Sequence, residues 1–89
     1  MNRNDFVQEL AAQGFPEPVT VDQVPNGGIG PHRHEFEAKA LILEGEITLE
    51  VDGRKTVYRP GDVFHLQLNQ LHSEQYGPQG VRYLAGRKV

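Results

Sequence analysis

Hydrophobic and polar residues alternate with a period of two in the middle of the chain. The alternating positions are Ile47, Leu49 and Val51 on one face, with Thr48 and Glu50 on the other. This pattern is typical of a strand that buries one face. The dipeptide Asp52-Gly53 follows directly. Because glycine tolerates positive φ, this dipeptide predicts a tight hairpin turn into a return strand over residues 55–59.

Short apolar segments continue this pattern along most of the chain. Further strands are expected over residues 19–24, 32–43, 63–68, 71–76 and 81–85. Residues rich in Gly, Pro, Asn and Asp separate them and predict a loop at 25–31, a turn or bulge at 44–46, and turns at 60–62, 69–70 and 77–80. Closely spaced short strands of this kind favour an all-β fold, a double-sheet antiparallel barrel over residues 19–85.

The first fifteen residues have a helical period instead. Phe6 and Leu10 form one apolar stripe at helical spacing. Asn4 or Asp5 is the expected N-terminal cap, and Gly14 is a good residue for ending a helix. Residues 1–15 therefore predict one short helix and its cap, which closes one end of the core within a single domain of residues 1–89.

The stretch from residue 32 to residue 43 carries the candidate chemistry. If this strand is unbroken, its even positions share one face; they are His32, His34, Phe36, Ala38, Ala40 and Ile42. Two imidazoles beside small residues predict the lining of a cavity. The opposite face ends in Leu41 and Leu43, which the N-terminal helix or a second subunit should cover. Since large exposed apolar patches are uncommon on monomers, a homodimer is expected.

Composition excludes several classes of protein. The chain has 89 residues, 37% hydrophobic content, no cysteine and a formal net charge of −3. No apolar segment approaches the length of a bilayer span, so no membrane partner is expected. Acids and bases are interspersed without a basic cluster, which argues against nucleic acid as a partner. The absence of cysteine and of a recognisable signal sequence favours the cytoplasm.

Three histidines are the candidate metal ligands. His32 and His34 precede the apolar strand, and His72 follows the second group of turn residues. Neutral imidazole is a common ligand of first-row metals, so a divalent ion (Fe, Mn, Ni or Zn) is the expected cofactor. His65 alternates with apolar neighbours and is expected on the outer face.

These motifs resemble those of a small single-domain cupin. The first motif of that family is Gly, five residues, His-x-His, three or four residues, Glu, six residues, Gly; here His32, His34 and Gly45 match, while Ala38 occupies the Glu position. The second motif opens with Pro-Gly-Asp, as at residues 60–62, and ends in a histidine, here His72. Residues 67–69 depart from its Pro-x-Gly. The resemblance covers roughly residues 19–83 and implies a cupin barrel.

The departure at Ala38 affects the implied site. The family's Glu often supplies a fourth ligand, whereas three histidines resemble the cupins that cleave C–C bonds or oxidise thiols with iron and dioxygen. Glu37 could replace that ligand only if a bulge turned it inward. Gln67, Phe36 and Tyr76 are further candidates for the pocket. No general base stands out; the nearest candidates are Glu37, Glu74 and Tyr76.

Three functions are consistent with this sequence. The first is a metal-binding cupin that takes a small polar metabolite, with dioxygenase or isomerase chemistry if it is an enzyme. The second is a non-enzymatic module that binds or senses a small molecule, with a structural metal or none. The third is an interaction domain whose apolar outer strand pairs two subunits. Fold alone does not separate them.

Overall fold

A computed structural model describes all 89 residues. The chain forms one helix and then six strands: α1 (Arg3–Ala12), β1 (Val19–Gln23), β2 (Gly28–His32), β3 (Glu37–Val51), β4 (Arg54–Tyr58), β5 (Val63–Leu66) and β6 (His72–Lys88). Every pair of neighbouring strands is antiparallel. The predicted all-β barrel with one short N-terminal helix is therefore confirmed.

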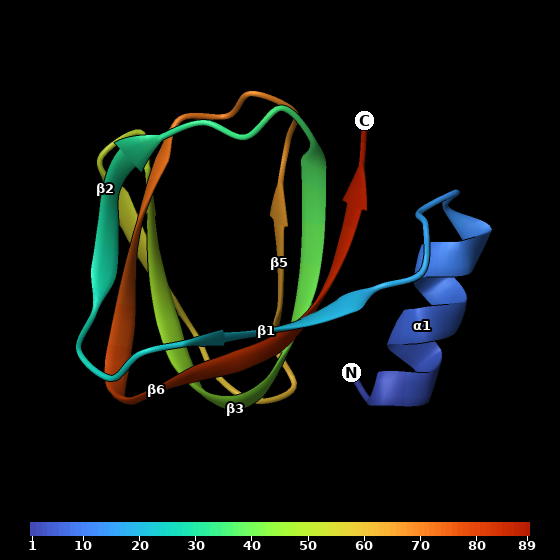
Figure 1. Ribbon diagram of the computed structural model, residues 1–89, viewed down its shortest axis with the longest axis horizontal. Helices are drawn as coiled ribbons and strands as arrows, with labels where there is room; N and C mark the ends of the chain where they lie inside the picture. Colours follow the sequence, from blue (N-terminus) through green and yellow to red (C-terminus); the bar gives the residue numbers. More distant parts are fainter.

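Two long strands, β3 and β6, organise the barrel. They pair with each other along most of their length, and each bends so that its two halves belong to two different sheets. One sheet has the order β1-β6-β3-β5 and the other has the order β2-β6-β3-β4. Figure 1 shows the strands surrounding a common interior, with α1 outside it beside the C-terminal half of β6.

The bend of β3 and β6 depends on Gly45. This residue has φ of 73°, and a Cβ there would lie 2.1 Å from the carbonyl oxygen of Gly80. The pairing of β3 with β6 shifts register on both sides of it, so the bulge predicted at residues 44–46 is confirmed. Residues 77–80, predicted as a turn between two strands, are instead a corner within the continuous strand β6.

The apolar residues form two clusters on opposite sides of one sheet. The larger cluster fills the barrel interior and includes Ala40, Ile42 and Phe64. The smaller one lies outside and joins Phe6 and Leu10 of α1 to Phe15, Leu41 and Leu84. The predicted apolar stripe of the helix is thus buried, although the N-terminal cap is Asn2, whose side chain accepts from the Asp5 amide. Both expected caps, Asn4 and Asp5, lie within the helix.

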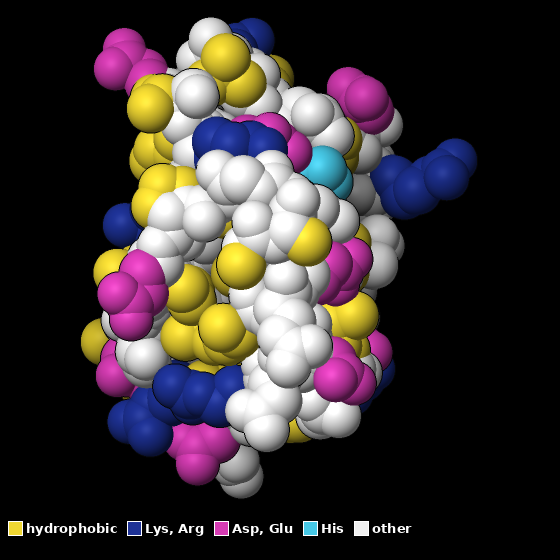
Figure 2. Space-filling view, turned by 90° about the vertical axis from the view of Figure 1, so that its right-hand side faces the viewer, with side chains coloured by type: hydrophobic (Ala, Val, Ile, Leu, Met, Phe, Trp, Pro, Cys, Tyr) yellow, Lys and Arg dark blue, Asp and Glu magenta, His cyan; other side chains and the backbone are white.

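The helix also covers the outer face that suggested a dimer. Leu41 is only 2% exposed, and Leu43 packs at the edge of the same cluster. The homodimer stays a prediction, but this face no longer supports it. Seen from the side of α1, hydrophobic atoms surface between charged side chains of both signs (Figure 2). No helix is long and apolar enough to cross a membrane.

The strand predicted from His32 to Leu43 is not continuous. β2 ends at His32 and β3 begins at Glu37, with a bend at residues 35–36 between them. His34 therefore lies in a connection rather than on the strand. Conversely, residues 28–31, predicted as loop, belong to β2, which pairs with β6.

Candidate metal centre

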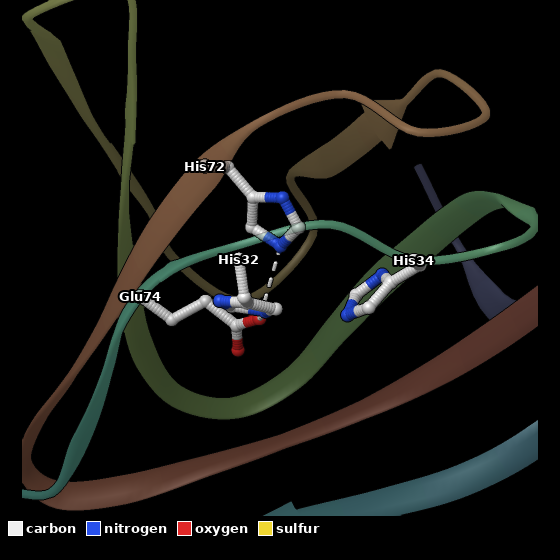
Figure 3. A group of neighbouring side chains, drawn as sticks. All are labelled: His32, His34, His72 and Glu74. Atoms are coloured by element: carbon white, nitrogen blue, oxygen red, sulfur yellow. Dashed lines mark hydrogen bonds and ion pairs between the residues drawn. The ribbon is translucent and has the colours of Figure 1, made fainter.

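The three predicted histidines come together at one end of the barrel, and Glu74 joins them. His32 ends β2, His34 follows in the connection, and His72 and Glu74 lie at the start of β6. One ligand atom from each of these four residues lies within 4.8 Å of all the others. Figure 3 shows the three imidazoles and the carboxylate turned toward the same space. The group resembles the donor set of a metal centre.

Backbone pairing explains why these residues meet. His32 and His72 are direct partners in the register of β2 and β6, and their ring centroids are 4.2 Å apart. Glu74 follows His72 by two residues, so both side chains point to the same face of β6. His34 approaches from the side: its ring stacks on Phe36 with centroids 4.7 Å apart, and its carbonyl accepts from the Asn69 amide at 2.9 Å.

Two of the histidines are oriented by backbone carbonyls. The Nδ1–H group of His32 donates to the Gly30 carbonyl at 2.7 Å, and that of His72 donates to the Gln70 carbonyl at 2.9 Å. In a neutral imidazole, a proton on Nδ1 leaves the lone pair on Nε2. Such second-shell bonds hold the rings of metal-binding histidines in place. Both Nε2 atoms are thus presented as ligands.

These Nε2 atoms converge on a carboxylate oxygen. Oε2 of Glu74 lies 3.1 Å from Nε2 of His32 and 3.2 Å from Nε2 of His72. Lone pairs and a carboxylate oxygen repel one another unless a cation lies among them. A proton or a metal ion can fill this role, and a set of three imidazoles and one carboxylate suits first-row metals. The residues present therefore fit a divalent metal.

The third histidine is held differently. Nδ1 of His34 is buried without a hydrogen-bond partner, so no carbonyl selects its tautomer. Burial lowers the pKa of His34 below its ordinary value, and the neighbouring imidazoles of His72 and His32 lower it further. His34 therefore stays neutral to lower pH than a free histidine, as a metal ligand must.

Tyr76 supports the carboxylate from behind. Its hydroxyl donates to Oε1 of Glu74 at 3.1 Å, and both side chains are buried. Burial raises the pKa of Tyr76, and the adjacent Glu74 charge raises it further. The phenol consequently remains a donor throughout the neutral range, leaving Oε2 directed at the histidines.

The remaining predicted site residues lie elsewhere or have other roles. Glu37 binds His65 on the outer surface, with an oxygen–nitrogen distance of 2.5 Å, so the acid in the cluster is Glu74 instead. Gln67 is exposed in the connection from β5 to β6, where its backbone N–H donates to Oε1 of Gln70. The sequence could have indicated Glu74 as a ligand, because residues 72 and 74 lie on the same face of the strand predicted over residues 71–76.

A cavity of about 120 Å³ adjoins the cluster inside the barrel. Its lining includes His34, Phe36, Ala38 and Ala40, as the alternation in the sequence predicted. Most of the lining is hydrophobic, and Glu74, a member of the histidine cluster, provides its acidic group. A small molecule in this cavity would contact the candidate metal centre directly.

Comparisons with known proteins agree with this architecture. A family model described as "Cupin domain" matches residues 19–75, which is more than half of the chain. Quercetin 2,3-dioxygenase of Bacillus subtilis (strain 168) is 35% identical over 57 residues, which cover 62% of this chain but only 17% of that enzyme. The match therefore spans a small part of the relative.

Solved structures with the same fold are numerous. The cupin domain of Schizosaccharomyces pombe Cnp3 superposes with a TM-score of 0.70 at 17% identity, covering 83% of this chain and 54% of that one. KdgF from Halomonas sp. gives 0.67 at 22% identity, with 83% and 71% covered. The polyketide cyclase RemF from Streptomyces resistomycificus gives 0.67 at 28% identity, with 88% and 58% covered. This chain spans little more than half of two of these three structures.

Proposed function

Because the chain belongs to the cupin domain family, we propose that it binds one divalent first-row metal through His32, His34, His72 and Glu74. The metal centre serves to bind a small polar metabolite in the adjoining cavity. The convergence of two Nε2 atoms on Oε2 of Glu74, each with its Nδ1 held by a carbonyl, carries this proposal.

The protein's own groups prepare the centre for chemistry. A bound metal would polarise an oxygen of the ligand or, if it is iron, activate dioxygen. Phe36 and the other apolar side chains of the cavity give one side of the centre a mostly hydrophobic surrounding. The similarity to quercetin 2,3-dioxygenase supports oxygen chemistry as the reaction class, with an isomerase as the other enzymatic candidate.

Elemental analysis of purified variants tests the metal site. We expect stoichiometric metal in the wild type, none in His34→Ala, and a clear reduction in Glu74→Gln. His65→Ala and Glu37→Gln are matched controls, because this pair lies on the outer surface away from the cluster. Equal metal in the wild type and His34→Ala, or loss only in the controls, would contradict the assignment.

A non-enzymatic binding module is the second candidate. The titratable groups that line the cavity are His34, Glu74, Tyr83 and Arg87, so no acid or base is free for proton transfer apart from the proposed ligands, a buried tyrosine and an arginine. Native metal identity and oxygen uptake separate the two. Iron with ligand-dependent oxygen consumption supports the enzyme, whereas zinc or nickel with binding but no turnover supports the module.

A further inference from the structure

Arg87 is a solvent-exposed cation near the end of β6 that also lines the cavity of the barrel. It is the direct cross-strand partner of Ala38, one pair further along the ladder than Lys39 and Gly86. Partners in an antiparallel ladder share a face, and Ala38 is buried in the interior cluster. The guanidinium carbon lies 5.3 Å from the centre of the Phe36 ring, and Arg87 lines the cavity beside His34.

No carboxylate of this chain neutralises Arg87. It belongs to none of the ion pairs in the structure, whereas Arg82, for example, pairs with both Asp22 and Glu44. Its cross-strand partner, residue 38, is the position where the cupin motif places Glu, and here that residue is Ala. The methyl group leaves the cation unpaired.

Glu74, the one carboxylate that lines the cavity, already has partners of its own. Oε2 of Glu74 faces His32 and His72, and its Oε1 accepts from Tyr76. Arg87 has no such partner among the ion pairs of the chain, so its guanidinium is free to pair with the carboxylate of a ligand whether or not a metal is bound.

We propose that the cavity binds a compact carboxylic acid whose carboxylate is held by Arg87. Guanidinium suits this group because it offers paired donors in a planar fork. The body of the ligand lies against Ala38, Ala40 and Phe64, which leave a volume of about 120 Å³ and so select a short chain of few carbons. The proposal deepens the proposed function by naming the ligand class, and its anchor does not require the metal.

Binding of butyrate, with butyramide as its uncharged counterpart, tests this anchor. Amide chemical shifts are followed by NMR during titration of zinc-loaded and metal-free protein, and zinc content is measured in the same samples. Because Arg87 is exposed to solvent, which weakens its ion pairs, we expect butyrate to bind about fivefold more tightly than butyramide in both forms. The metal-free arm excludes direct coordination of the carboxylate by zinc.

Variants assign that preference to Arg87. Arg87→Gln should abolish it in both forms, while Arg87→Lys should retain most of it because the positive charge remains. Arg59→Gln is the matched control, since Arg59 is 64% exposed and outside the cavity. Absence of butyrate binding, an unchanged preference in Arg87→Gln, or a preference seen only with zinc would overturn the proposal. If any of these results is found in protein that holds stoichiometric zinc, only the anion proposal fails and the metal site stands. If the protein binds no zinc but its preference for butyrate depends on Arg87, only the metal site is refuted.

Discussion

Replacing Tyr76 by Phe tests whether the protein behind Glu74 tunes the metal centre. The substitution removes one hydroxyl from a residue that is 4% exposed and keeps the ring in the interior cluster. It deletes the hydrogen bond of 3.1 Å to Oε1 of Glu74 without touching a proposed ligand. The carboxylate would then lose its only donor on that oxygen.

The magnitude follows from two independent considerations. A hydrogen bond to a charged group contributes about 1.5–3 kcal/mol. Loss of a second-shell partner typically lowers metal affinity about 10–100-fold, which corresponds to about 1.4–2.8 kcal/mol. The two ranges agree, so we expect Tyr76→Phe to weaken zinc binding by about 10–100-fold. Because burial and Glu74 raise the pKa of Tyr76, this loss should not vary with pH across the neutral range.

Competition against a chromophoric chelator measures the affinity of each variant for zinc. Tyr58→Phe is the matched control, because Tyr58 packs edge-on to Phe64 with centroids 5.8 Å apart and lies outside the metal cluster. Circular dichroism establishes that both variants keep the barrel. Unchanged affinity in Tyr76→Phe, or an equal loss in Tyr58→Phe, would refute the role assigned to the phenol.

Three further predictions concern the scaffold and the protonation of the site in metal-free protein, each read from urea denaturation. Phe6 of the helix is fully buried against the sheet, so Phe6→Ala should lower the free energy of unfolding by about 3–5 kcal/mol. Val7 on the same helix is 37% exposed, so Val7→Ala should lower it by less than about 1 kcal/mol. Equal losses would mean that the helix does not cover the sheet. Gly45→Ala should destabilise far more than Gly53→Ala, because both have positive φ but only Gly45 would also meet backbone, and a similar loss in both would exclude that steric effect. In the folded protein the pKa of His34 is lowered, first by burial and then by the neighbouring imidazoles. The unfolded chain therefore binds more protons below about pH 6.5, and the free energy of unfolding falls as the pH decreases through this window. His34→Gln should make this dependence on pH less steep, and an unchanged dependence would contradict the assignment.

Local patterns predicted those parts of the fold that depend on nearby residues. The alternation over residues 47–51 and the Asp52-Gly53 turn appear as expected, with positive φ at both turn residues. The pairing of β2 with β6 could not be predicted in this way, because residues 28–31 contain glycine and proline and are typical of a loop. In the structure, a Cβ at Gly28 would lie 2.7 Å from the Glu74 carbonyl. The glycine therefore permits close approach of two strands that are distant in sequence.

The site, like the fold, was predicted where it depends on neighbouring residues and not where it depends on contacts between distant ones. The even spacing of His32 and His34 predicted a shared orientation, and both rings do reach the cluster, yet His34 reaches it from a connection after β2 has ended. The spacing of two residues therefore predicted that the two imidazoles lie close together, but not that His34 lies outside a strand. Glu74 was within reach of the same reasoning, because it follows His72 by two residues on one strand.

The position of Arg87 beside the cavity could not be predicted in this way, because it depends on the register between β3 and β6. Residues 86–89 look like a polar tail in the sequence, but β6 continues to Lys88 and pairs with the beginning of β3, which places Arg87 opposite Ala38 at the edge of the cavity. A Glu at position 38, where the cupin motif places it, would lie directly across the ladder from Arg87, where opposite charges attract. In this chain the acid of the histidine cluster is Glu74, which lies on the half of β6 that pairs with β2. With Ala38 opposite it, Arg87 has no carboxylate partner in this chain, and this is why we propose an anion as the ligand of the cavity.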